Sequence, residues 1–321
     1  MCSDIVRSIG AAAEEAAVEA AWAQWAAITS VAVPAGQPRV WAIVDPEALI
    51  LVSIAVRHRE RRLDDLLAGW ARTGSSLVSI QRLKALAKHF PTQVQEQVGY
   101  FARHAADAGD RRWLAHASDG GAEGFVDRGK ELGPPRLLDG PGLMLRLRAG
   151  IGVGAKADLL TYLLGIQGAS ADLRALTVAT GYSDRALRTA ADEMALARFI
   201  RTVPGTPSAY RADPDAWMPL TGAGSGDVPP WRFWSLAFAF LAAVGAWERE
   251  ASLHGWSCYV ASSRARDLME LHGPRMRYLS AQLDSGSEAR GAEYLDVFMR
   301  TVQRMALWAR EHLYQPHRAN A

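Results

Sequence analysis

The stretch that decides the fold is LRALTVATGYSDRALRTAADEM at residues 173–194, followed by ARFIRTVPGTPSAYRAD at residues 197–213. In the first stretch, apolar residues recur at helical spacing on both sides of the tripeptide GYS at 181–183. Glycine can end a helix because it adopts the left-handed conformation without strain, and serine is a favoured N-cap. The stretch therefore predicts a helix over 171–180, a tight turn, and a second helix over 184–197.

The predicted helix over 184–197 has two different faces, and Ser183 is its expected N-cap. One face is apolar and should be buried, because its members are spaced three and four residues apart: Leu187, Ala190, Ala191 and Met194. The opposite face carries long cationic and small polar side chains: Arg185, Arg188, Thr189 and Asp192. Two helices joined by a tight turn are the arrangement of a helix-turn-helix unit, whose second helix contacts DNA through its first turns.

The stretch after this helix predicts a small hairpin. Residues 199–203 and 208–212 read as strands, and the Pro-Gly-Thr-Pro sequence at 204–207 reads as the turn between them. Two arginines, Arg201 and Arg211, lie on the strands, and two hydroxyl residues, Thr206 and Ser208, lie near the tip. A cationic hairpin beside the exposed helix face can press on the phosphates that flank a groove.

A further helix is expected over 155–164, and Ser170 is the expected N-cap of the helix over 171–180. The stretch from Lys156 to Asp213 resembles the winged-helix DNA-binding domain of bacterial MarR- and ArsR-type transcriptional regulators. The resemblance implies a repressor that binds double-stranded DNA, as a homodimer on a near-palindromic site. The chain departs from the family at Ala197 and Arg198, where the family usually has a glycine between the recognition helix and the first wing strand.

The resemblance assigns DNA contacts residue by residue. It implies recognition-helix contacts from Ser183, Arg185, Arg188 and Thr189, and wing contacts from Arg201, Thr206, Ser208 and Arg211. The alternative is an interaction protein, such as an antitoxin-like neutralising partner, that uses the same unit as a docking surface. In that case Arg185 and Arg188 form an ordinary solvated face, paired with Asp184 and Asp192 at helical spacing.

The segment at 143–158, LMLRLRAGIGVGAKAD, contains three glycines at 150–154 and is a competing signal for phosphate binding. It fits a dinucleotide pattern through Gly150, Gly152 and Ala155, but no alternating series of strands and helices follows. The P-loop pattern also fails, because Ala157 stands where a serine or threonine should bind magnesium. We therefore interpret the segment as a flexible entry to the next helix, with Arg146, Arg148 and Lys156 near the DNA backbone.

Composition sets limits on the class of protein. The chain has 321 residues, of which 49% are hydrophobic and 22% charged, as in a globular protein. A formal net charge of +2 is too small to predict nucleic-acid binding by itself. Cys2 and Cys258 cannot form a disulfide framework, and we expect Cys2 at a mobile terminus, so a reducing cytoplasm fits best. The most apolar run, 231–247, is too short for a membrane span.

The remaining sequence predicts a mainly α fold with three parts. These are an N-terminal helical domain at 1–142, the central winged helix-turn-helix at 143–219 and a C-terminal helical domain at 220–321, which we expect to dimerise. Boundaries are expected at the Gly- and Pro-rich segments 118–142 and 220–230. Predicted helices cover 1–29, 46–56 after the cap Asp45, 62–72, 79–89 after the cap Ser79, 92–107, 231–250, 260–271, 274–283 and 290–313.

Catalytic signals are weak throughout. The eight histidines are scattered, none of them forms a metal-binding pair with a glutamate between, and there is no nucleophile elbow. We therefore expect no enzyme activity, no cofactor and no metal. The densest basic run, RHRERR at 57–62, reads as a solvated helix end, with DNA phosphates or an acidic partner as the alternative ligands.

Overall fold

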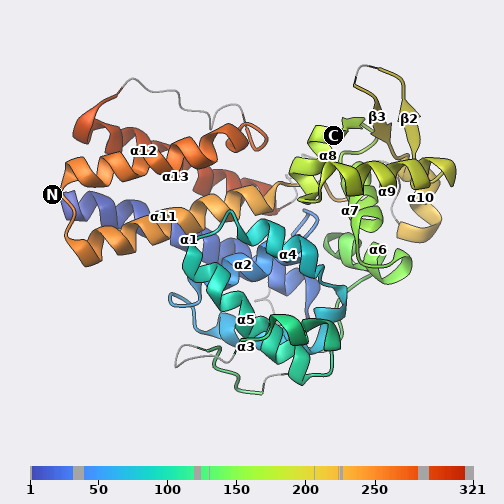
Figure 1. Ribbon diagram of the computed structural model, residues 1–321, viewed down its shortest axis with the longest axis horizontal. Helices are drawn as coiled ribbons and strands as arrows, with labels where there is room; N and C mark the ends of the chain where they lie inside the picture. The colour runs from blue at the N-terminus through green and yellow to red at the C-terminus, as the bar shows by residue number, and fades with distance from the viewer. Residues whose placement is uncertain are drawn as a thin grey trace, which may run out of the picture.

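The computed structural model describes residues 2–31, 40–118, 124–129, 131–205, 207–222, 224, 227–280 and 289–314. The chain is mainly helical, as predicted, and the described residues also form a small three-stranded antiparallel sheet, which has one strand more than the predicted hairpin. Figure 1 shows three groups of elements: α1 with α11, α12 and α13; α2 to α5; and α6 to α10 with the strands.

The N-terminal half of the chain forms the helices that the sequence predicts. They are α1 (Cys2–Ile28), α2 (Pro46–Val56), α3 (Arg62–Thr73), α4 (Ile80–Ala87) and α5 (Thr92–Asp107), with the short 3-10 helices Ser75–Leu77, Arg111–His116 and Gly140–Gly142. The two predicted N-caps are confirmed. The Asp45 carboxylate accepts a hydrogen bond from the Ala48 backbone N–H at 3.1 Å, and the Ser79 hydroxyl accepts one from Arg82 N–H at 3.2 Å.

The central elements are α6 (Leu143–Ile151), α7 (Ala155–Gly165), β1 (Ala171–Asp172), α8 (Leu173–Thr180), α9 (Asp184–Leu196), β2 (Arg201–Val203), β3 (Ala209–Arg211) and α10 (Pro214–Thr221). The prediction for the start of α8 is wrong. Residues 171–172 pair with β3, so α8 begins later and its N-cap is Asp172, which accepts from Ala175 N–H at 2.7 Å. Ser170 therefore does not cap α8. Residues 143–151 form a regular helix, although a flexible entry was expected there.

The C-terminal elements are α11 (Trp234–His254), α12 (Cys258–Met276), the 3-10 helix Gly291–Glu293 and α13 (Tyr294–Leu313). The prediction of two helices at 260–271 and 274–283 is wrong, because a single helix, α12, continues through Pro274 and ends at Met276. Residues 281–283 lie outside the described residues. A proline inside a helix costs one backbone hydrogen bond. The buried neighbours His272, Gly273 and Met276 supply packing that offsets this loss.

Two apolar cores organise the fold. The first takes large buried side chains from both ends of the chain, including Trp25, Trp70, Phe101, Phe238 and Phe298. The second lies under α7, α8, α9 and the sheet. Helices of segments 1–142 and 220–321 thus share one core, and the three-part division stays a prediction. Most apolar side chains of α11 are buried inside the chain, whereas Leu253 near its end is 79% exposed; dimerisation through the helices of 220–321 stays a prediction.

Cys2 and Cys258 form a disulfide that joins the first residue of α1 to the first residue of α12, with their Cα atoms 5.5 Å apart. This corrects the expectation of a free Cys2 at a mobile terminus. The two helices belong to the same core, which brings the two cysteines within bonding distance. In the described part of the chain, no helix has both the length and the apolar character that a membrane crossing requires.

Candidate nucleic-acid interface

The turn between α8 and α9 sets the direction of α9. Gly181 has a φ of +74°, and its N–H donates to Thr177 O at the end of α8. Ser183 is the N-cap of α9, where its hydroxyl accepts from Ala186 N–H at 3.4 Å. The Thr177 hydroxyl donates to the Asp184 carboxylate at 2.6 Å, which ties the end of α8 to the start of α9. A glycine end and a serine cap thus produce the tight turn, as predicted.

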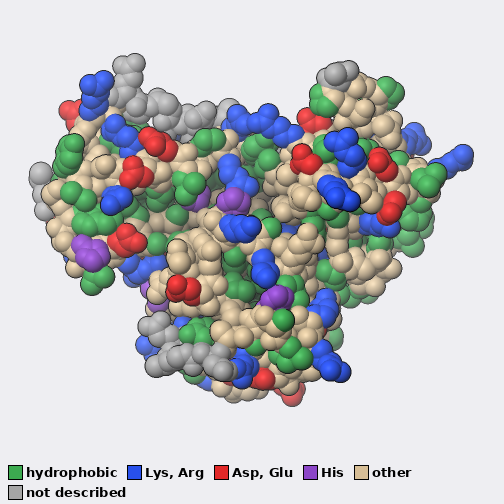
Figure 2. All heavy atoms as spheres, in the orientation of Figure 1, with side chains coloured by type: hydrophobic (Ala, Val, Ile, Leu, Met, Phe, Trp, Pro, Cys, Tyr) green, Lys and Arg blue, Asp and Glu red, His purple; other side chains and the backbone are tan. Residues whose placement is uncertain are grey.

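The two faces of α9 are those that the spacing predicts. Its buried residues are Leu187, Ala190, Ala191 and Met194. Four residues were predicted to contact DNA from this helix and its N-cap, and all four are exposed: Ser183, Arg185, Arg188 and Thr189. Among the described residues, neither Arg185 nor Arg188 forms an ion pair, so the pairing with Asp184 and Asp192 that belongs to the alternative reading is not seen. Cationic and acidic side chains lie side by side over α9 in Figure 2.

The junction after α9 uses a left-handed residue without being a glycine. Arg198 has a φ of +60°. Its N–H donates to Ala195 O at 3.0 Å, and the Phe199 N–H donates to Met194 O at 2.9 Å, which closes the helix end. The backbone therefore adopts at Arg198 the conformation that a glycine would adopt at lower cost.

The sheet beside α9 has the order β1-β3-β2, with all pairs antiparallel. The hairpin of β2 and β3 places Arg201 directly opposite Arg211, and both residues are exposed. Side chains opposite each other in an antiparallel pair lie on the same face, and like charges in such a pair are destabilising. Neither arginine has an acidic partner within ion-pair distance among the described residues, so the hairpin presents two charges that only an external anion would balance.

We expect Arg201→Ala to separate binding from stability. Removing one of two opposed cations should leave the free energy of unfolding unchanged or raise it by about 0.5 kcal/mol. The affinity for duplex DNA should fall by a similar factor for every sequence, because a backbone contact carries no sequence information. Urea unfolding and fluorescence anisotropy measure the two effects. A clear loss of stability with unchanged DNA affinity would assign Arg201 a structural role instead.

The other residues singled out from the sequence lie in different settings. Ser208 is exposed, and Thr206 lies outside the described residues. Lys156 is exposed on α7, and its Nζ lies 2.7 Å from the Glu193 carboxylate of α9. Arg146 donates to Thr221 O at 2.8 Å. The expectation that Arg148 lies near the DNA backbone is wrong, since this side chain is fully buried.

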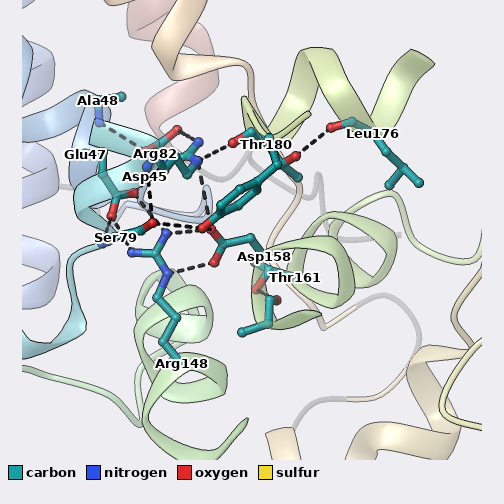
Figure 3. Close-up of polar contacts among 12 residues, drawn as sticks. Asp45, Glu47, Ala48, Ser79, Arg82, Arg148, Asp158, Thr161, Leu176 and Thr180 are labelled. Carbon is teal, nitrogen blue, oxygen red and sulfur yellow. Dashed lines mark hydrogen bonds and ion pairs between the residues drawn. The ribbon is translucent and has the colours of Figure 1, made fainter. Parts of the chain in front are cut away.

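Arg148 belongs to a buried ionic network that the sequence did not reveal (Figure 3). The network contains two arginines and three carboxylates, all of which are inaccessible to solvent: Arg82, Arg148, Asp45, Glu47 and Asp158. Arg82 binds Asp45 and Glu47, with Nη1 2.5 Å from an oxygen of each. Arg148 binds Glu47 at 2.6 Å and Asp158 at 2.7 Å. Glu47 therefore bridges the two arginines.

The network connects the helical body to the turn before α9. Arg82 of α4 donates through Nε to the Thr180 carbonyl at the end of α8, at 2.6 Å. The Tyr182 hydroxyl, in the turn itself, lies 2.9 Å from Ser79 Oγ and 3.0 Å from an Asp158 carboxylate oxygen. Gly181 packs so closely that a Cβ there would lie 3.1 Å from Leu86 of α4. The position of α9 relative to α4 is thus fixed by directional contacts.

The electrostatics of the network keep Glu47 ionised. Burial by itself raises the pKa of Glu47, but Arg148 and Arg82 outweigh it and hold the pKa below its ordinary value. Burial, reinforced by Asp158, raises the pKa of Tyr182, so its hydroxyl stays protonated and can donate. A local motif could not have identified this site, because Arg148 and Glu47 are 101 residues apart in sequence.

The lowered pKa of Glu47 predicts acid sensitivity. A carboxyl whose folded pKa lies below its unfolded pKa stabilises the fold above the unfolded value, about 4.3, and loses this contribution as the pH falls through the folded pKa. The free energy of unfolding should therefore decrease when the pH is lowered below about 4.3. In urea titrations, Glu47→Gln should show a shallower acid decrease than the wild type, and the exposed Glu250→Gln is the control. Equal acid decreases in wild type and Glu47→Gln would contradict this assignment.

The glycine-rich segment adjoins α9. Gly152 and Gly154 have φ values of +106° and +154°, and no side chain caps the N-terminus of α7. A shallow hollow lies between this loop and α9, with Lys156, Thr189 and Glu193 in its lining. Within the described residues, no group of three or more His, Cys, Asp or Glu side chains could hold a metal ion.

The basic run at 57–62 is largely engaged within the chain. Arg57 pairs with Asp64 at 3.1 Å, while His58 and Arg59 both face the buried carboxylate of Glu14. Arg62 pairs with Glu60 and lies over the ring of Trp22. The run therefore stabilises the contact between α1, α2 and α3.

Comparisons of the chain with protein-family models, with curated proteins and with solved structures find no match.

Proposed function

We propose that this protein is a sequence-specific regulator of transcription that binds double-stranded DNA, acting as a repressor. The observation that carries the proposal is the exposed face of α9, where Arg185 and Arg188 have no ion-pair partner among the described residues. The hairpin beside it presents Arg201 and Arg211, which likewise form no ion pair with an acidic residue in the described part of the chain. The order α7, β1, α8, α9, β2, β3 with a β1-β3-β2 sheet supports a winged helix-turn-helix at this place.

In this proposal α9 enters the major groove by its N-terminal turns. Arg185 and Arg188 donate to guanine O6 and N7 or to phosphates, and Thr189 makes a short contact with a base edge. Ser183 donates to a phosphate at the start of α9, and the hairpin arginines hold the flanking backbone. Lys156 contributes less, because Glu193 already balances its charge. If the protein binds as a homodimer, its two half-sites lie about 34–36 Å apart.

The test is a salt series with the DNA upstream of the protein's own gene and with a scrambled duplex of equal length. The proposal predicts tight binding to the upstream duplex, weaker binding to the scrambled duplex, and an affinity that falls steeply as the salt concentration rises, as release of counterions requires. Equal affinity for both duplexes, or no binding at low salt, would contradict it.

One observation favours a second candidate function, a docking module for another protein. Apolar side chains are exposed where α9 ends and α10 runs beside it: Leu196, Phe199, Met218 and Leu220, with Leu196 86% exposed. Exposed apolar patches mark sites of contact with proteins or membranes, or ligand-binding grooves. A stable complex with the product of a neighbouring gene, together with no binding to the upstream duplex, would favour an antitoxin-like role.

A further inference from the structure

A second group of cations lies outside the winged region, where the C-terminal ends of α4 and α12 meet. We call it the basic seam and define it by Lys84, Lys88, Arg275 and Arg277, with His89 beside them and His272 buried behind them. Lys84, Lys88, His89 and Arg277 are exposed, and Arg275 is half-buried. Arg277 lies over the ring of Tyr278 at 5.5 Å.

The seam lacks acidic partners. None of its members forms an ion pair among the described residues. Burial, then Arg275 and Lys88, lower the pKa of His89 to about 4. Burial, then His89 and Arg275, do the same for His272. Arg275 acts on both histidines and Lys88 acts on His89, and no acidic group is among the charged neighbours that shift their pKa values, so the local potential is positive.

A structural role alone explains only part of this arrangement. Cations in the last turn of a helix interact favourably with its carbonyl ends, and this accounts for Lys88 on α4 and Arg275 on α12. It does not account for the approach of Arg275 of α12 to His89, which follows Lys88 at the end of α4, because like charges that come together from two helices repel each other.

The seam and α9 belong to one rigid arrangement. Arg82 and Leu86 of α4 contact the turn that starts α9, through the Thr180 carbonyl and Gly181. In the view of Figure 2, Lys, Arg and His side chains form a column where α4 and the end of α12 meet, on the same face that presents α9. A long polyanion that lies against α9 and extends across this face would meet the seam.

We propose that the basic seam binds backbone phosphates of the same DNA duplex, beyond the site that α9 reads. This inference rests on the proposed function. The exposure of Lys84, Lys88 and Arg277 suits a polyanion that approaches from outside, and the charges come from the ends of two separate helices. Such contacts add affinity without sequence preference and extend the footprint on one side.

The test compares two double variants that remove the same charge. Lys88→Ala/Arg277→Ala removes two exposed seam cations, and Arg7→Ala/Arg264→Ala removes two exposed cations that each face an aspartate three residues away. Affinity is measured across a salt series on two duplexes. One contains only the sequence that α9 reads, and the other extends beyond that sequence on both sides.

The seam variant should lose about 10-fold in affinity at low salt on the extended duplex, with a salt slope smaller by about two, and should match wild type on the short duplex. The control should match wild type on both. A wild-type slope for the seam variant on the extended duplex would overturn the inference while the proposed function stands. If the wild-type protein binds neither duplex, both fail. Lys84→Gln, which should lower the slope by about one, decides the outcome if the double variant does not fold.

Discussion

Arg188→Ala is expected to weaken binding to a duplex that carries the recognition sequence by about 1–3 kcal/mol, a loss of about 5- to 150-fold in affinity. The reason is the position of Arg188, which is exposed on α9 and has no ion pair among the described residues, so its guanidinium is free for a base edge. A bidentate contact with guanine is worth this amount because the wrong base leaves the donors unpaired. The measurement is fluorescence anisotropy at fixed salt concentration.

The controls for Arg188→Ala separate a loss of DNA recognition from a loss of protein stability. Its thermal unfolding should equal that of wild type, since the side chain is exposed and forms no ion pair within the described residues. Arg264→Ala removes an exposed arginine of α12 that faces Asp267, and should leave the affinity unchanged. Unchanged affinity in Arg188→Ala would remove this residue from the interface.

Arg82→Met is expected to lower the free energy of unfolding by about 3–5 kcal/mol. The methionine fills similar space, but Asp45 and Glu47 lose the cation that binds both of them in a solvent-free site. Removing one partner of a buried ion pair is costly because the remaining charge stays desolvated. Urea unfolding measures the loss, and the exposed Lys84→Met on the same helix is the control.

The same variant should loosen the start of α9. Arg82 also donates to Thr180 O, and Tyr182 shares Asp158 and Ser79 with the network. Hydrogen exchange at residues 181–186 should therefore accelerate more than exchange in α13, which lies in the other core region. A loss of less than about 1 kcal/mol, with unchanged exchange at this turn, would show that the network neither stabilises the fold nor positions α9.

The features that could be predicted from the sequence are those set by residues close together in the chain. The turn before α9 could be predicted because Gly181 and Ser183 act within a few residues of their own positions. The cap at Asp45 and the two faces of α9 follow in the same way, from short-range chemistry and helical spacing. The exposed arginines of α9 could therefore be named before the structure was known.

Features that depend on distant partners could not be predicted. The strand β1 is two residues long and exists only because β3, nearly forty positions later, pairs with it. Arg148 reads as a surface cation in a flexible segment, and only the fold shows that Glu47 and Asp158 surround it. The shared core of α1 with α11 and α13 is likewise a property of the whole chain, which a division at glycine-rich loops does not reveal.

The most direct test of the central claim is selection from a pool of random DNA duplexes by the wild-type protein and by Arg188→Ala. The claim is that the exposed face of α9 reads base edges. It predicts that the wild type enriches one defined sequence, and that the variant enriches the same sequence with relaxed preference at one or two positions. Enrichment of no sequence by the wild type, or of an identical sequence by both proteins, would contradict it.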